Sequence, residues 1–294
     1  MVATTTTTAP APTRRGRAGA FGAYVGPLLL IYSLALVLPY ALMLRMTFNE
    51  FSSTFLYRET FTLANYATVL GDPFYLELIA RTVWLGLVVS AIALVLGYPV
   101  ALLIMRSSAR TKAVIMTIAL SPMLINLVVR TYAWLVILGD TGVVNTTLTG
   151  IGLIDAPLPI NDNFFAVVVG LVHVYLPLMI ISLVGVMDRI DPALIEAGES
   201  LGARGHEIWL KILLPLSMPG IGVGLLLVFC HAVSAFVTPA LLGGNNVSTV
   251  STVIYDKFTI AINWPIGATL VFVLLVVIFS VIFLHGRLFA EKGY

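Results

Sequence analysis

The chain has 294 residues, of which 59% are hydrophobic and 10% are charged, and its mean hydropathy is +1.02. This composition excludes a soluble globular domain, because membrane runs of about 20 apolar residues account for most of the length. The runs are continuously apolar rather than alternating, which excludes a membrane β-barrel. A net charge of +2 identifies no partner by itself, and we expect no nucleic-acid ligand.

Six apolar runs predict an all-α, polytopic membrane protein with six transmembrane helices. Residues 1–20 begin with Thr, Ala and Pro and are expected to form a disordered cytoplasmic tail. A transmembrane domain then occupies residues 21–285, and residues 286–294 form a cytoplasmic C-terminal tail. The first run is too long for the hydrophobic region of a signal peptide, so we interpret it as an uncleaved span. The predicted spans are 21–44, 82–105, 113–138, 164–187, 221–242 and 264–284.

The distribution of Lys and Arg sets the orientation, because basic residues near the ends of spans are retained on the cytoplasmic side. With both termini in the cytoplasm, eleven basic residues lie inside and only Arg45, Arg58 and Lys257 lie outside. The longest polar run between two spans, residues 188–216, is therefore predicted to be a cytoplasmic loop.

A short helix should open this loop. Asp191 can cap free N–H groups, and Pro192 already has the helical φ and needs no donor at the first helical position. Gly202 can adopt the left-handed conformation that ends the helix. We expect a second short helix over 204–213, which leads to Pro215 and back into the membrane. The apolar face of the first helix consists of Leu194, Ala197 and Leu201, at i, i+3 and i+7.

The loop resembles the EAA loop in the membrane subunits of bacterial ABC importers, a pattern of EAA, three residues, G, nine residues, I, one residue and LP. The matching positions are Glu196, Ala197, Gly198, Gly202, Ile212, Leu214 and Pro215. Gly198 stands where the pattern has Ala, and the missing methyl group costs the helix up to about 1 kcal/mol. The resemblance implies a type I ABC importer permease fold, in which this helix, with Leu201, docks into a groove of a separate ATPase. The alternative is an ordinary cytoplasmic loop with caps and turns.

The chain carries no signature of ATP hydrolysis. A P-loop requires Gly-Lys-Ser/Thr, whereas Lys112, Lys211, Lys257 and Lys292 follow Thr, Leu, Asp and Glu. We therefore expect no enzymatic activity, metal or cofactor in this chain, with ATP and Mg²⁺ bound by a partner. The resemblance implies a second, homologous permease subunit in a heterodimer, two ATPase subunits, a periplasmic solute-binding protein and a small-molecule solute. It also implies a multi-pass location in the lipid bilayer of the bacterial inner membrane.

Two other classes of transport protein have to be weighed. A secondary transporter driven by H⁺ or Na⁺ usually carries Asp or Glu within its spans to bind the coupling ion, and the six predicted spans contain neither residue. His173 and His231 are candidates for a proton relay, although a single His in a span more often bonds to a neighbouring helix. A channel would conduct downhill without an ATPase.

Further segments resemble the polyamine, opine and phosphonate branch of these permeases, and most closely its spermidine/putrescine subunits, over about residues 20–290. These segments are 61–66 (FTLANY), 96–101 (LGYPVA), 129–134 (VRTYAW) and 236–244 (FVTPALLGG). Outside the membrane we count eight acids against three bases, and an acidic mouth would attract polyamines. The alternative is a solvated face with no bearing on the solute, since the retention of cations inside depletes them outside. The eight acids are Glu50, Glu59, Asp72, Glu77, Asp140, Asp155, Asp162 and Asp256.

The spans also contain candidates for the translocation pathway. Arg130 is an unusual charge near the outer end of the third span, where Pro122 breaks the helix, and we expect it to brace an outer gate; the alternatives are snorkelling or pairing with Asp140. The other candidates are polar-tipped or aromatic, and each is alternatively an interfacial anchor or a packing residue. They are Tyr132, Trp134, His173, Tyr175, His231 and Phe236.

Prolines within the spans and the segment 245–263 form two further, weaker sequence patterns. Pro99, Pro177 and Pro239 interrupt their spans, where they serve as hinges or as static kinks. Residues 245–263 alternate apolar and polar residues, which predicts a plain surface connector; the alternative is an interfacial helix that touches the solute-binding protein.

Overall fold

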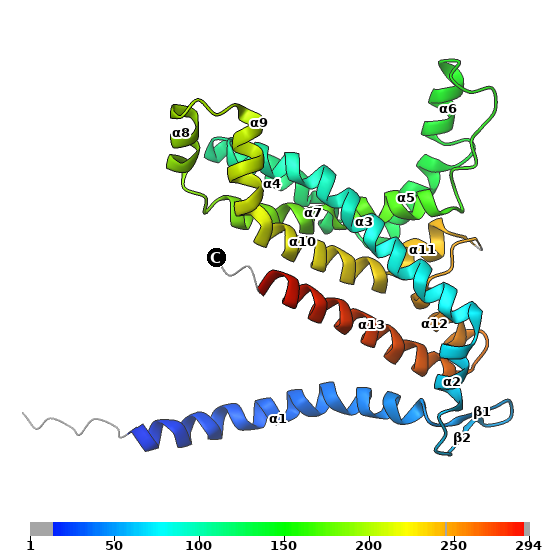
Figure 1. Cartoon of the computed structure of the whole chain (residues 1–294). Coiled ribbons are helices and arrows are strands. Elements are labelled where there is room, and N and C mark those ends of the chain that lie inside the picture. Colours follow the sequence, from blue (N-terminus) through cyan, green and yellow to red (C-terminus); the bar gives the residue numbers. More distant parts are fainter. Residues whose placement is uncertain (1–13, 245, 291–294) are drawn as a thin grey trace, which may run out of the picture.

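A computed structural model describes residues 14–244 and 246–290 of the chain (Figure 1). It confirms a helical membrane protein, with one addition: a short antiparallel hairpin in which Glu50 pairs with Arg58. Within the described residues, six helical stretches are long and apolar enough to cross a membrane. The elements are α1 (Arg14–Met46), β1 (Glu50–Ser52), β2 (Leu56–Arg58), α2 (Ala64–Gly71), α3 (Pro73–Met105), α4 (Ala109–Leu124), α5 (Leu127–Leu138), α6 (Val143–Gly150), α7 (Phe164–Met187), α8 (Pro192–Ser200), α9 (Gly205–Ile208), the π-helix η1 (Trp209–Leu213), α10 (Leu214–Ser234), α11 (Val237–Leu242), α12 (Val250–Thr259) and α13 (Trp264–Ala290).

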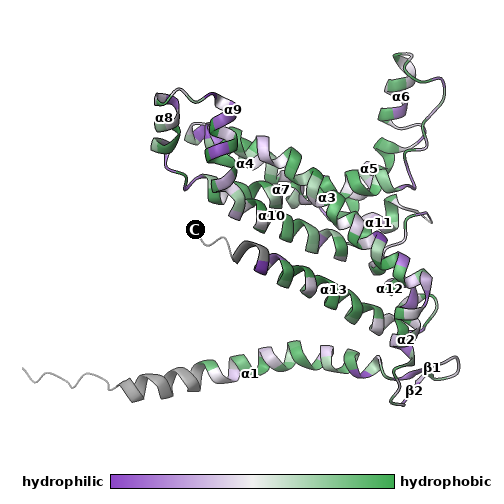
Figure 2. Cartoon of the chain, in the orientation of Figure 1, coloured by the Kyte–Doolittle hydropathy of each residue, from purple (hydrophilic) through white to green (hydrophobic). Residues whose placement is uncertain are grey.

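Helices α3, α7 and α10 form the centre of the molecule, and each packs against the other two. Their ribbons are predominantly hydrophobic along the whole bundle, whereas α8 and α9 are more polar (Figure 2). Helix α7 coincides with the predicted span 164–187. It is the most buried of the membrane helices, which explains why its apolar pattern is uninterrupted.

Helix α3 begins before the predicted start of its span at residue 82. The Asp72 carboxylate accepts a hydrogen bond of 2.9 Å from the Phe74 N–H, and Pro73 occupies the first helical position. This cap places the helix start outside the apolar run, because capping chemistry rather than hydropathy determines where a helix begins.

The third predicted span, 113–138, is not one helix. It is divided into α4 and α5 by a break at Ile125 and Asn126. The Asn126 side chain accepts hydrogen bonds from the N–H groups of Val128 (2.9 Å) and Val129 (3.4 Å) and so caps a new helix. The break therefore lies at Ile125 and Asn126 and not at Pro122, which lies inside α4.

The fifth predicted span, 221–242, is also corrected. A single helical stretch runs from Gly205 through η1 to Ser234, so the expected separate helix at 204–213 is the first part of this span. The chain breaks at Ala235 and Phe236 before α11.

Pro215 does not end this stretch, because η1 precedes it. The Leu214 N–H bonds to the Trp209 carbonyl, five residues back. This wider turn accommodates the proline ring, which in a regular α-helix clashes with the carbonyl four residues earlier.

The two ends of the chain differ from prediction. Helix α1 begins at Arg14, so residues 14–20 are helical rather than a disordered tail, while residues 1–13 lie outside the described part. Helix α13 extends to Ala290, beyond the predicted end of its span at 284, so residues 286–290 are part of this helix. Helix α1 approaches the rest of the chain mainly at its Met46 end and near α13 (Figure 1).

Residues 245–263 contain the alternative helix, α12, rather than a plain surface connector. The Thr249 side chain caps it, and Val250 and Val253 are buried where α12 packs on α13. It is therefore an integral part of the outer end of the bundle. Contact with a solute-binding protein remains a prediction.

Candidate functional site

Helix α8 opens the cytoplasmic loop with the predicted caps. The Asp191 carboxylate accepts a hydrogen bond of 2.9 Å from the Ala193 N–H. At the other end, Gly202 has φ +78. Its N–H bonds to the Glu199 carbonyl (2.9 Å), and the N–H of Ala203 bonds to Gly198 (3.0 Å), which is the Schellman pattern of helix ends.

The outer face of α8 exposes apolar side chains. Leu194 is 47% exposed and Leu201 is 89% exposed, and Glu196 and Ala197 are exposed beside them. An apolar side chain as exposed as Leu201 on a short cytoplasmic helix has no partner within the described chain. The outer face of α8, defined by Leu194, Glu196, Ala197 and Leu201, is thus available for contact with another protein.

The remaining motif residues lie on the inner side of the loop. Gly198 is buried, and a Cβ atom there would lie 3.1 Å from Ile212 Cδ1. Ile212, Leu214 and Pro215 are half-buried in η1 and α10. The motif therefore divides into an exposed set on α8 and an inner set that holds α8 against the root of α10.

Sequence reasoning missed two contacts at the base of this loop. Lys112 on α4 pairs with Asp188, the C-cap of α7. Tyr98 on α3 shares a hydrogen bond of 3.1 Å with Ser217 on α10. The partners are 76 and 119 residues apart, so no local pattern could indicate either pair.

Arg130 lies in the first turns of α5 and is only 7% exposed. Its Nη1 donates to the Pro122 carbonyl on α4, across the break, and no acceptor faces Nε within the described chain. The alternative pair with Asp140 is absent among the described residues, since Asp140 is exposed in the turn after α5 and forms no ion pair. Arg130 instead places its charge on the carbonyl end of α4, which carries a partial negative charge.

The other pathway candidates form pairs that connect several helices. Trp134 Nε1 on α5 donates to His173 Nδ1 on α7 over 3.0 Å. Tyr175 on α7 stacks on His231 of α10 with ring centroids 5.5 Å apart.

A third pair continues this arrangement at the second break. Phe236, between α10 and α11, lies 4.7 Å from the Tyr255 ring of α12. Tyr132 stands apart, because its side chain is 51% exposed and it joins none of these pairs. The aromatic band, defined as these three pairs, therefore contains five of the six polar-tipped or aromatic candidates.

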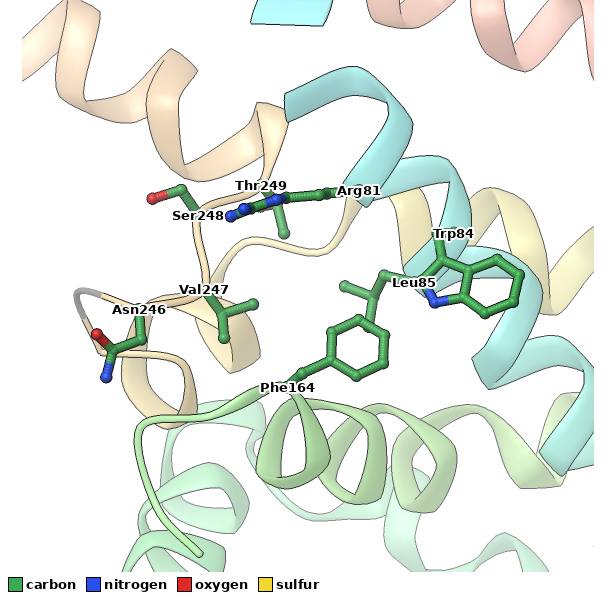
Figure 3. Close-up of a pocket in the computed structure, with 8 residues that line it drawn as sticks. All are labelled: Arg81, Trp84, Leu85, Phe164, Asn246, Val247, Ser248 and Thr249. Carbon is green, nitrogen blue, oxygen red and sulfur yellow. The ribbon is translucent and has the colours of Figure 1, made fainter. Parts of the chain in front are cut away.

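A separate pocket of about 230 Å³ lies at the outer end of α3 (Figure 3). It opens between α3, the start of α7 and the loop before α12, and Arg81 extends along one side (Figure 3). Arg81 also pairs with Glu77 at 2.6 Å. None of the predicted pathway residues lines this pocket, whose lining residues are Arg81, Trp84, Leu85, Phe164, Asn246, Val247, Ser248 and Thr249.

Comparison with known proteins places this geometry in a family. Residues 93–290 match the family described as binding-protein-dependent transport system inner membrane component. The chain is 33% identical over 251 residues to the spermidine/putrescine transport system permease protein PotB of Haemophilus influenzae, covering 85% of this chain and 87% of that protein. PotB of Escherichia coli K12 is 32% identical over 227 residues, which cover 77% of this chain and 82% of that protein.

The fold also matches a solved structure. A chain from the crystal structure of a bacterial ABC transporter involved in the import of the acidic polysaccharide alginate gives a TM-score of 0.73 at 20% identity, covering 94% of this chain and all of that one. The chain thus belongs to the binding-protein-dependent transport system inner membrane component family, and it is a multi-pass permease subunit of a bacterial ABC importer whose ATP hydrolysis is carried out by a separate ATPase.

Proposed function

We propose that this permease subunit imports a polyamine such as spermidine or putrescine, delivered by a periplasmic binding protein. The observation that carries the proposal is the 33% identity to a spermidine/putrescine permease over 85% of the chain. The fold does not choose the solute, since the matching alginate transporter imports an acidic polysaccharide.

The charge on the outer side supports a cationic solute. All eight of the outer acids named above are exposed, and of these only Glu77 forms an ion pair within the described chain. Exposed carboxylates raise the local concentration of cations on the side of the membrane that carries them. A polyamine released by a binding protein would therefore remain near this surface.

The assembly we propose contains a second, homologous permease subunit in a heterodimer and two ATPase subunits that bind ATP and Mg²⁺. The outer face of α8 docks on one ATPase, because its exposed Leu194 and Leu201 offer an apolar contact at the cytoplasmic end. The buried Gly198 transmits the contact to Ile212 and so to α10.

Within the membrane, we assign the aromatic band and Arg130 to the translocation pathway. The band connects α5, α7 and α10, and its third pair joins the break at Phe236 to α12. Broken helices in a membrane protein are tolerated where they line a cavity or are covered by protein. Arg130 braces the outer gate by holding α5 on the end of α4.

Reconstitution tests the solute and the energy source together. The full complex in proteoliposomes, with the binding protein and labelled spermidine, should accumulate spermidine only when ATP is present. A dicarboxylate of similar length is the matched control and should not be accumulated. ATP-dependent uptake of the dicarboxylate alone would reject the polyamine. Uptake that persists without ATP and collapses with an ion gradient would indicate a secondary transporter, and downhill flux without an ATPase would indicate a channel.

A further inference from the structure

We call the cytoplasmic loop, residues 188–216, the coupling loop. At the α7 end of this loop an ion pair joins the chain to α4, and helix stability does not explain the positions of its two charges. Asp188 lies at the C-terminal end of α7 and Lys112 lies in the first turn of α4. Helix macrodipoles favour acids at N-termini and bases at C-termini, so each charge lies at the end that disfavours it. The Lys112–Asp188 ion pair compensates both, and it lies three residues before Asp191, the cap of α8.

At the other end of the coupling loop, the start of α10 is joined to α3. Tyr98 and Ser217 share a buried hydrogen bond of 3.1 Å, and they are 7% and 0% exposed. The Tyr98 ring also meets the edge of the Trp209 ring in η1, with centroids 6.0 Å apart. One side chain of α3 therefore contacts both the π-helix and the start of α10.

Between these two contacts, α8 packs on α9 and lies beside η1. A Cβ atom built on Gly198 would lie 3.1 Å from Ile212 Cδ1 in η1 and 3.5 Å from Ile208 Cγ1 in α9. A displacement of α8 is therefore passed to α9 and η1. From η1 the displacement reaches α3 through Tyr98. At the α7 end of the loop, the displacement reaches α4 through the ion pair of Asp188 with Lys112.

We propose that the Lys112–Asp188 ion pair and the Tyr98–Ser217 hydrogen bond are positioning contacts for energy coupling, which make α3 and α4 move with the coupling loop. This inference depends on the proposed docking of α8 on the ATPase. Without the two contacts, a displacement of α8 reaches α3 and α4 only through their packing on α7 and α10, and less of it is transmitted. Since α4 carries the carbonyl that holds Arg130, the gate then opens incompletely although ATP is hydrolysed.

The decisive measurement is the amount of solute imported per ATP hydrolysed by the full complex in proteoliposomes. Lys112→Glu places two acids together, and we expect this ratio to fall at least fivefold while hydrolysis continues. Asp188→Lys should act in the same way. The double exchange Lys112→Asp with Asp188→Lys restores the pair in reverse and should return the ratio to within about twofold of wild type.

Arg110→Glu is the matched control. Arg110 lies in the same first turn of α4, is exposed and forms no ion pair in the described part of the chain. The Arg110→Glu substitution makes the same change in net charge as Lys112→Glu, near the same end of the span. The amount of solute imported per ATP hydrolysed by Arg110→Glu should therefore equal that of wild type. If Lys112→Glu fails to insert, the double exchange still tests the pair, because it keeps the net charge of the wild type.

The hydrogen bond is tested with Tyr98→Phe, which retains the ring contact with Trp209 and removes the hydroxyl. Tyr98→Phe and Ser217→Ala should each lower the ratio, and the double variant should be no worse than either single variant. Wild-type ratios in Lys112→Glu and Tyr98→Phe, or a double exchange as uncoupled as its singles, would overturn the inference.

A separate variant distinguishes this inference from the docking proposal. Leu201→Asp should release the ATPase during purification, because it places a charge on the docking face. If Leu201→Asp retains the ATPase and full transport, the docking proposal fails. If it releases the ATPase while Lys112→Glu remains fully coupled, only the positioning contacts are rejected.

Discussion

Arg130 shows how a charge can remain inside a membrane span without a carboxylate partner. Its guanidinium cannot lose its proton at physiological pH, and a charge at the centre of a span costs about 2.5–3.5 kcal/mol on insertion scales. The carbonyl end of α4 offsets part of this cost, because Nη1 donates to Pro122. The side chain therefore connects two half-helices that the backbone leaves separate.

This contact predicts the effect of removing the charge. Arg130→Gln loses a charge-assisted hydrogen bond of about 1.5–3 kcal/mol, and since about 1.4 kcal/mol corresponds to tenfold, ATP-driven uptake should fall roughly tenfold or more. Membrane abundance should change little. Arg130→Lys keeps the charge but not the planar guanidinium fork, so its uptake should lie between that of wild type and that of Arg130→Gln. Uptake by Arg130→Gln equal to wild type at equal abundance would remove Arg130 from the gate.

Gly202 permits a test of docking that leaves the backbone intact. No atom lies within 4 Å of a Cβ built at this residue, but its φ is +78, a conformation that Asn and Asp tolerate better than other side chains. Gly202→Asp should therefore insert normally but lower ATPase retention and transport severalfold. Gly202→Asn has the same shape without the charge and should retain most activity. Co-purification and uptake check both variants, and normal uptake by Gly202→Asp would contradict the docking role.

The residues of the coupling loop were largely predictable, whereas their division into two sets was not. Caps and turns depend on neighbouring residues alone, so Asp191 and Pro192 indicate where α8 begins in the sequence and Gly202 indicates where it ends. The burial of Gly198 depends on Ile208 and Ile212 in another helix, and no pattern in the loop reports that packing. Arg130 was recognisable as unusual, but its hydrogen bond to the Pro122 carbonyl was not predictable, because the bond depends on how α4 and α5 meet at the break.

At the scale of elements, helices were predicted best where hydropathy alone decides. Helix α7 is the most buried of the membrane helices and matches its predicted span. The break in the third span was predicted at Pro122 but lies at Ile125 and Asn126, because the Asn126 side chain caps a new helix while changing the mean hydropathy of the apolar run very little. Conversely, Pro99 and Pro177 lie within intact helices, since neighbouring helices and local adjustments tolerate proline in membrane spans.

The packing of α8 on η1 predicts a gain from restoring the methyl group that the family pattern has. Gly198→Ala should strengthen the helix by up to about 1 kcal/mol, while Ile212 Cδ1 moves by a few tenths of an ångström from a 3.1 Å approach. We expect a small rise in the thermal unfolding temperature of the purified complex and unchanged uptake. Gly198→Leu is the control, since its larger side chain should displace α8 and lower both. A lower unfolding temperature for Gly198→Ala would show that Ile212 cannot yield.

At the scale of the whole molecule, the topology places the acidic surface and the coupling loop on opposite sides of the membrane. The single cysteine, Cys230, makes this testable with one background substitution. In a Cys230→Ser chain, Asp155→Cys should react with a membrane-impermeant maleimide added outside intact spheroplasts. Glu199→Cys, on α8, should react only after the membrane is opened. The reverse labelling pattern would invert the orientation and reject the docking proposal with it.

The π-helix at Trp209–Leu213 has a consequence for how this family member could tolerate insertions and deletions. The segment η1 contains one residue more than a regular α-helical turn accommodates. Deleting one of its residues would give an ordinary α-helix, in which the Pro215 ring conflicts with the carbonyl four residues earlier. The length of this short segment therefore decides whether Pro215 fits within a continuous helix, and the loss of a single codon would strain the connection between α8 and α10 while leaving every residue of the docking face in place.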